Sequence, residues 1–222
     1  MLEKYKTIFQ IPDEIEIQLV NVEGKQELTY IPEQKKAIIH LDPKFPQDLA
    51  ELIAQLKLGI EYHPLLATFY FQPNLTKEEE IFASSFYTAV VPVVDAWVYK
   101  TMKEYLPTEE LEKQLEELQT LWERLELEKL YTGNTEPEAD RRRHSFSMYL
   151  IFKILGYPAQ LKLIGKGKQL QEWIRYKKTL EWAIQQTPSP EILTQIPEKT
   201  KAPYKVSVKD KYYEIKVTSS RL

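Results

Sequence analysis

Residues 14–22 read EIEIQLVNV, a stretch in which charged or polar side chains alternate with apolar ones. Alternation with a period of two is typical of a β-strand that buries one face. Residues 26–31 (QELTYI) and 35–41 (KKAIIHL) also read as strands, and the Glu-Gly-Lys turn at 23–25 favours a hairpin between the first two. We therefore predict a three-stranded antiparallel sheet in this part of the chain.

The middle of the sequence changes to a helical pattern, in which apolar residues recur every three or four positions. Pro92 is expected to bend the second of these helices, because its ring removes a backbone hydrogen bond. Residues 65–72 (LLATFYFQ) fit either a strand or a buried helical extension. The predicted helices cover residues 47–62, 76–105, 108–131, 137–155 and 169–186.

The last part of the sequence is rich in proline and then alternates again. Prolines at 188, 190, 197 and 203 indicate an extended linker, and residues 204–217 (YKVSVKDKYYEIKV) predict a β-hairpin. The fold class is thus α+β, with the N-terminal sheet packed on a mostly helical body and a hairpin at the C-terminal end. We expect a main domain over 1–186, with the linker and hairpin of 187–222 packed on it.

Composition excludes several kinds of chemistry. The chain has no cysteine, which rules out disulfides, thiolate nucleophiles and cysteine-ligated metals. The first twenty residues are charged throughout, and we find no window with the ~18 consecutive apolar residues of a spanning helix. A cytoplasmic protein without a membrane contact is expected. Six glycines against fourteen prolines, with abundant Lys and Glu, favour a thermophilic source over the alternative of an AT-rich genome.

Two common catalytic motifs are missing. Gly165-Lys-Gly-Lys168 lacks the spacing and the hydroxyl of a phosphate-binding loop, and no Gly-x-Ser-x-Gly elbow occurs. We therefore predict no catalytic residue, no intact motif implies a cofactor, and a non-enzymatic protein is favoured over an enzyme.

His63 stands at the end of the helix predicted within LAELIAQLKLGIEYHPLLATF, residues 49–69. A strand followed by such a helix and a His-Pro pair resembles the zincin-type metallopeptidases. Their helix carries His-Glu-x-x-His, in some members with a further His-Pro. Aligning His63 with that last histidine places the motif on Ala54, Gln55 and Leu58, so this chain lacks all three motif residues.

The zincin resemblance covers about residues 35–105 and implies an inactive scaffold whose groove holds a peptide or a metal. Asp95 lies in the next helix, where such folds often carry an acidic or amide residue. Glu61, His63 and Asp95 form the hypothetical metal site, although Glu61 and His63 do not share a helix face. The alternative that we favour is an ordinary amphipathic helix ending in a histidine.

Charge divides the helical middle into two parts. Residues 104–140 contain twelve acidic and three basic residues, a net charge of −9, whereas residues 141–178 contain ten basic residues and one acidic, a net of +9. One interpretation is that the acidic helix 108–131 pairs with the basic region. The other is a basic surface that binds phosphates, with Tyr157, Trp173 and Tyr176 stacking on bases.

The leading functional hypothesis is a binding protein that contacts nucleic acid, or another polyanion such as an acidic protein, through residues 141–178. The candidate cations are Arg141, Arg142, Arg143, Lys162, Lys166, Lys168, Arg175 and Lys177. The inactive zincin-like scaffold is the alternative.

Overall fold

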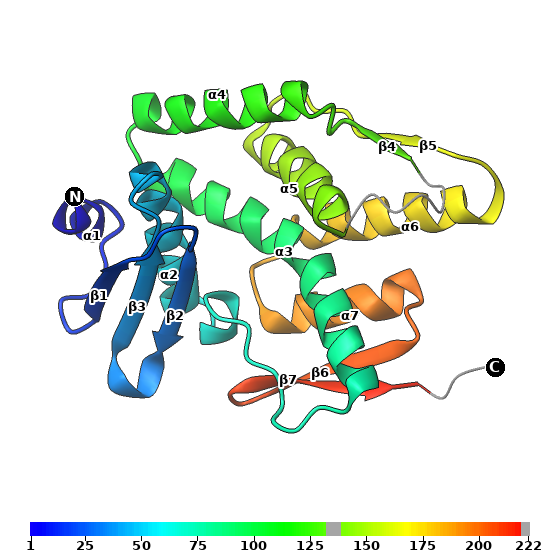
Figure 1. Cartoon of the computed structure of the whole chain (residues 1–222), viewed down its shortest axis with the longest axis horizontal. Helices are drawn as coiled ribbons and strands as arrows, with labels where there is room; N and C mark the ends of the chain where they lie inside the picture. The colour runs from blue at the N-terminus through cyan, green and yellow to red at the C-terminus, as the bar shows by residue number, and fades with distance from the viewer. Residues whose placement is uncertain (132–138, 219–222) are drawn as a thin grey trace. The chain divides into compact units, whose positions relative to one another are not determined.

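The computed structural model describes residues 1–131 and 139–218, in which helices predominate (Figure 1). The chain forms two compact units. Unit 1 comprises Met1–Phe69 and Val98–Leu115, and unit 2 comprises Tyr70–Trp97 and Glu116–Leu222. One boundary between the units falls between Phe69 and Tyr70, and the other two fall inside α3 (Lys77–Tyr105) and α4 (Thr108–Arg124).

The sheet of unit 1 contains the three predicted strands in the order β1-β3-β2. The strands are β1 (Glu16–Asn21), β2 (Glu27–Ile31) and β3 (Lys36–Leu41). β2 pairs antiparallel with β3, but β1 pairs parallel with β3, so the sheet is mixed. The prediction of an all-antiparallel sheet, with a hairpin between the first two strands, was therefore wrong in this detail.

β3 takes the centre because it is the most apolar of the three strands. Its Ala37, Ile39 and Leu41 are buried, whereas most residues of β1 are exposed. The loop after β1 is tied to the end of β3, since the carboxylate of Asp42 accepts hydrogen bonds from the backbone N–H groups of Gly24 and Lys44. This loop leads the chain past β3 instead of folding β2 back on β1.

Helices complete unit 1. α2 (Leu49–Glu61) packs on β2, on β3 and on α1 (Leu2–Ile8), a short helix that the sequence reasoning missed. A short 3₁₀ turn, η3 (Pro64–Leu66), packs tightly on α2, because a Cβ added to Gly59 would lie 2.4 Å from the Cβ of Ala67. Two further 3₁₀ turns are η1 (Pro32–Gln34) and η2 (Pro46–Asp48).

Unit 2 combines helices with short strands. Its elements beyond α3 and α4 are β4 (Lys129–Tyr131), α5 (Ala139–Leu155), β5 (Lys162–Ile164), α6 (Gly167–Ala183), α7 (Pro190–Thr200), β6 (Tyr204–Lys209) and β7 (Tyr212–Val217). The parallel pair β4-β5 was not predicted. The predicted helix 108–131 ends at Arg124, and its last residues form β4 instead. α7 packs on α6 and on β6.

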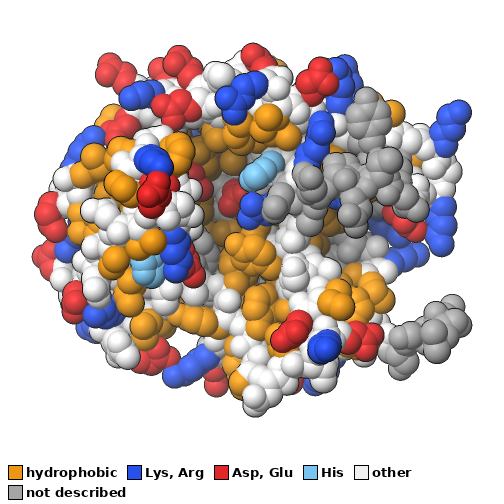
Figure 2. Space-filling view, viewed as in Figure 1, with side chains coloured by type: hydrophobic (Ala, Val, Ile, Leu, Met, Phe, Trp, Pro, Cys, Tyr) orange, Lys and Arg blue, Asp and Glu red, His pale blue; other side chains and the backbone are white. Residues whose placement is uncertain are grey.

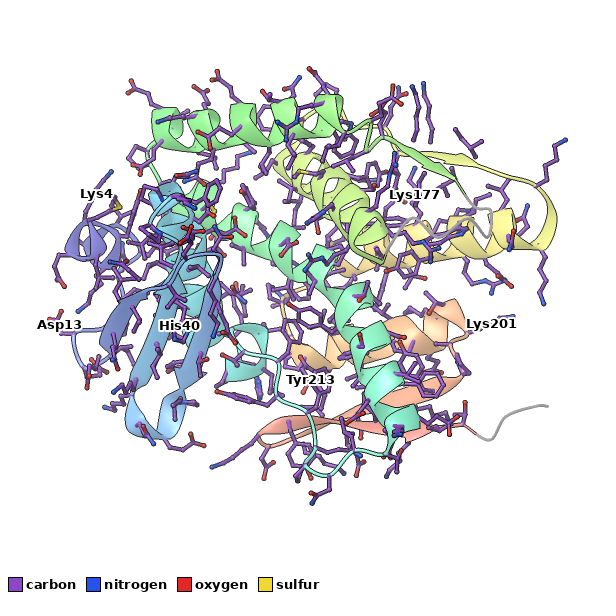
Figure 3. All side chains as sticks on the ribbon, in the orientation of Figure 1. Lys4, Asp13, His40, Lys177, Lys201 and Tyr213 are labelled. Atoms are coloured by element: carbon purple, nitrogen blue, oxygen red, sulfur yellow. The ribbon has the colours of Figure 1, made fainter. Side chains whose placement is uncertain are left out.

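The predicted extended linker was wrong over 190–200, which form α7. Ser189 caps this helix by accepting a hydrogen bond from the N–H of Ile192, and Pro190 occupies the first turn, where no N–H is needed. The predicted C-terminal hairpin is confirmed as β6-β7. Its Tyr213 is completely buried against Phe71 and Phe86 and is labelled in Figure 3.

A capping box precedes α3, in which Thr76 and Glu79 exchange hydrogen bonds, and the helix contains Pro92. By length and composition it is apolar enough to cross a membrane, with a mean hydropathy of 1.5 over its most apolar window. Our expectation that no segment approaches this limit was therefore wrong. Of that window, 56% is buried inside the protein, and Phe86 and Val90 are completely buried, as in the core helix of a globular domain.

Candidate functional site

In unit 1, the two candidate metal ligands at the end of α2 are engaged in contacts with residues of the same unit. His63 caps η3, because its Nδ1 accepts a hydrogen bond of 3.2 Å from the backbone N–H of Leu65. The carboxylate of Glu61 forms an ion pair of 2.9 Å with Lys57 and accepts a hydrogen bond from the hydroxyl of Tyr105. Each of these contacts stabilises the end of α2.

The motif positions suggested by the zincin resemblance serve packing. Ala54 and Leu58 are buried in the core of unit 1. The side-chain amide of Gln55 donates a 2.9 Å hydrogen bond to the carbonyl oxygen of Ala67, which holds η3 against the helix. The described residues contain no group of three or more His, Asp or Glu side chains that could hold a metal ion. The zincin-like scaffold stays a prediction.

Asp95 belongs to unit 2, where it pairs with α5. Its carboxylate accepts a hydrogen bond of 2.6 Å from the hydroxyl of Ser147. Although some of the residue surface is exposed, protein encloses the carboxyl group. Desolvation raises the pKa of Asp95 to about 6, while the bond from Ser147 and the charge of Arg143 oppose this rise. Asp95 is thus a half-buried residue with a desolvated carboxyl group, whose pKa is raised above the usual range for aspartate.

The cations of unit 2 gather along α6. Two adjoining cavities, of about 440 and 750 Å³, share Gln171 and Arg175 in their walls. We call them together the α6–α7 groove, and their basic side chains are Arg142, Lys168, Arg175, Lys178, Lys199 and Lys201. Glu172 is the one acidic side chain in the described lining, and it lies 4.0 Å from Lys168.

Several groove cations carry no compensating charge. Arg175, Lys178 and Lys201 make no ion pair within the described ranges 1–131 and 139–218. The Nε atom of Arg142 is shielded from solvent and has no hydrogen-bond partner among the residues described. Such unpaired donors and charges favour an anionic ligand.

Aromatic rings hold two of these cations in place. The guanidinium of Arg142 lies 5.3 Å from the centre of the Trp173 ring, and the ammonium of Lys199 lies 4.1 Å from that of Trp182. Both distances fall within the range of a cation–π interaction, about 6 Å. The two charges are therefore positioned before any ligand arrives.

The structure distributes the predicted cations unevenly. Arg142, Lys168 and Arg175 line the groove, whereas Lys162 and Lys166 are exposed outside its lining. Lys177 lies on the α5 side of α6, where its ammonium is 4.7 Å from the ring centre of Tyr149 (Figure 3). Arg141 and Arg143 are half-buried and do not line the groove.

Three groove cations were missing from the predicted site. Lys178 was counted in the basic region but not selected, and Lys199 and Lys201 lie in the segment expected to be a linker. Lys201 ends α7 (Figure 3). The signal that could have found Lys199 and Lys201 is the Ser189-Pro190 pair, which marks a helix start and so brings these basic residues to the end of a helix.

The predicted stacking residues also separate. Trp173 and Tyr176 pack on Phe146, with ring centres 5.9 and 4.9 Å away. Tyr176 donates a hydrogen bond to the carbonyl oxygen of Ala89, and the half-buried side chain also lines the groove. Tyr157 is exposed but lines a different cavity.

Ion pairs link the acidic and basic segments to other parts of the chain. Glu110 pairs with Lys4, and Lys153 pairs with Glu181. On the face drawn in Figure 2, acidic and basic side chains are interspersed. These contacts give no support to direct pairing of the acidic helix with the basic region.

Comparisons of the chain with protein families, with curated proteins and with solved structures find no match.

Proposed function

We propose that the protein binds nucleic acid through the α6–α7 groove, by contacts to the phosphate backbone. The observation that carries this proposal is the gathering of six basic side chains and one carboxylate along two adjoining cavities. Lys and Arg that neutralise phosphates release condensed counterions, which drives binding without reading the sequence.

The start of α6 adds to the positive potential. Helix N-termini carry a partial positive charge and free N–H groups, and this helix has no acidic residue in its first turn. Lys168 lies in that turn, and 92% of its side chain is exposed. A phosphate near this end of the groove would therefore meet a dipole and a mobile ammonium together.

Aromatic packing of the groove supports backbone contacts over base stacking. A cation already lies over one face of each indole, Arg142 over Trp173 and Lys199 over Trp182. We therefore expect weak dependence on base sequence, and binding of single strands and duplexes within about tenfold of each other in affinity, as for non-specific phosphate binding.

The test is fluorescence anisotropy with a labelled oligonucleotide, using a variant with Arg175→Glu, Lys178→Glu and Lys199→Glu. We expect the wild type to bind at low salt and the variant to bind at least about 100-fold more weakly, since several phosphate contacts are lost and repulsion is added. Equal binding by the two proteins would refute the proposal.

A matched control reverses three exposed lysines outside the groove, with Lys25→Glu, Lys44→Glu and Lys205→Glu. It changes the net charge by the same amount, so it separates a local site from general attraction. We expect it to keep most of the wild-type affinity. If both variants lose binding equally, the protein has no defined nucleic-acid site. If the groove variant binds the oligonucleotide as the wild type does but no longer binds an acidic protein, the partner of the groove is a protein.

A further inference from the structure

Unit 2 holds another cavity, of about 570 Å³, apart from the two that form the groove. Its charged side chains are acidic, whereas those of the groove are mostly basic. It is lined by the end of α4, the turn that follows it, α5 and the segment 157–160. Its volume lies within the range of about 300–1,000 Å³ found for small-molecule sites. We call it the aromatic–acidic cavity, and the residues that define it are Trp122, Phe152, Tyr157, Glu123, Glu126 and Glu128.

The three aromatic rings meet edge to face. The ring centres of Trp122 and Phe152 are 5.9 Å apart with planes at 82°, and those of Phe152 and Tyr157 are 6.4 Å apart at 88°. Tyr157 is 44% exposed, whereas Trp122 and Phe152 are buried and only 8% exposed. Perpendicular rings around a hollow present both edges and faces to a guest, and ring faces attract cations.

Three glutamates supply negative charge to the same cavity, and no basic side chain lines it among the residues described. Glu126 is paired with Lys129 at 3.3 Å, and Glu123 accepts a hydrogen bond of 3.0 Å from Gln119. Glu128 differs from both. Its Oε2 atom is shielded from solvent and has no hydrogen-bond partner in the described part of the chain.

An unpartnered, dehydrated carboxylate oxygen is costly unless a donor or a cation compensates it. The aromatic rings of the cavity donate no strong hydrogen bond to this oxygen. They can, however, pack against the alkyl groups of a substituted ammonium ion. A guest with one positive charge and a methylated or alkylated surface would satisfy both parts of the lining. An anion would be repelled by the carboxylates of Glu123 and Glu128, and a neutral apolar guest would leave Glu128 uncompensated.

We propose that the aromatic–acidic cavity binds a small organic cation of the alkylammonium class. The rings contact the alkyl groups around the nitrogen, and Glu128 supplies the counter-charge. This site is separate from the α6–α7 groove and does not depend on the proposed nucleic-acid binding.

The test compares choline with its neutral carbon isostere, dimethylbutanol, by isothermal titration calorimetry on the full chain. Both molecules have the same shape, so they differ only in charge. We expect saturable binding of choline and at least about tenfold weaker binding of the isostere, the scale set by a desolvated cation–π contact with a counter-charge. Equal binding of the two, or no binding of either, would overturn the proposal.

Two variants assign the binding to the cavity. Glu128→Gln keeps the shape and removes the charge, and we expect it to weaken choline binding about tenfold. Tyr157→Leu changes an exposed ring that the core does not need, and we expect a loss of about threefold to tenfold. Wild-type affinity for choline in both variants would also overturn the proposal. The indole N–H signal of Trp122, assigned with Trp122→Phe, should shift when choline binds.

Discussion

The end of α2 and the α6–α7 groove both contain residue types that suggest a binding site, but their side chains are used differently. At the end of α2, His63 caps η3 and Glu61 pairs with Lys57. In the groove, Arg175 and Lys178 have no ion-pair partner among the residues described. The difference shows that residue type alone does not indicate a site, because a side chain already satisfied within the fold has little left to offer a ligand.

The largest effect that we expect concerns packing near His63. Gly59→Ala should destabilise unit 1 by about 1–3 kcal/mol, because the new Cβ would lie 2.4 Å from the Cβ of Ala67. Chemical denaturation of the variant and the wild type measures this change. If the variant is as stable as the wild type, η3 can move away from α2 at no cost. The contact between Gly59 and Ala67 is then not tightly packed.

The next effect concerns the buried acid of unit 2. Because the pKa of Asp95 is raised to about 6, the folded protein holds its proton more tightly than the unfolded chain does. The contribution of Asp95 to stability should therefore be greatest below its unfolded pKa and be lost as the pH rises through about 6. Between pH 4 and pH 7 the wild type should lose about 2 kcal/mol more than Asp95→Asn does.

Denaturant titrations of both proteins at a series of pH values test this expectation. Ser147→Ala is a useful companion variant, because it removes the hydrogen bond that favours the charged carboxylate. It should move the pKa of Asp95 further upward and make the total loss of stability with rising pH larger. Parallel pH profiles for the wild type and Asp95→Asn would contradict the assignment of Asp95 as a desolvated acid.

A smaller effect separates capping from metal binding at His63. His63→Ala should cost about 1 kcal/mol, since it removes the acceptor for the N–H of Leu65, whereas His63→Asn should retain most of the stability. Thermal unfolding with and without zinc provides the readout. If zinc stabilises the wild type but not His63→Ala, His63 is a metal ligand and the contrast with the groove fails.

Sequence periodicity predicted most elements because their cores follow it. β3 alternates between buried and half-buried residues, and Thr76 with Glu79 marks the start of α3. Pairing was harder to predict, since the parallel contact of β1 with β3 depends on a loop held by Asp42. α7 was missed because four prolines outweighed the cap at Ser189.

The candidate site was predicted only in part, for a physical reason. Arg142, Lys168 and Arg175 were named from the charge pattern, but Lys199 and Lys201 approach α6 only because α7 packs on it. Glu61 and Asp95 likewise accept hydrogen bonds from residues far away in the sequence, Tyr105 and Ser147. Such long-range contacts decide which polar side chains stay free, and no local pattern reports them.

The most direct test of nucleic-acid binding through the groove is the salt dependence of oligonucleotide affinity. For the wild type, the logarithm of the binding constant should fall linearly with the logarithm of salt concentration, with a slope of about −0.9 for each phosphate contacted in a duplex. The variant with Arg175, Lys178 and Lys199 each replaced by Glu should have a slope shallower by about two to three units. Identical slopes for the two proteins would contradict the account.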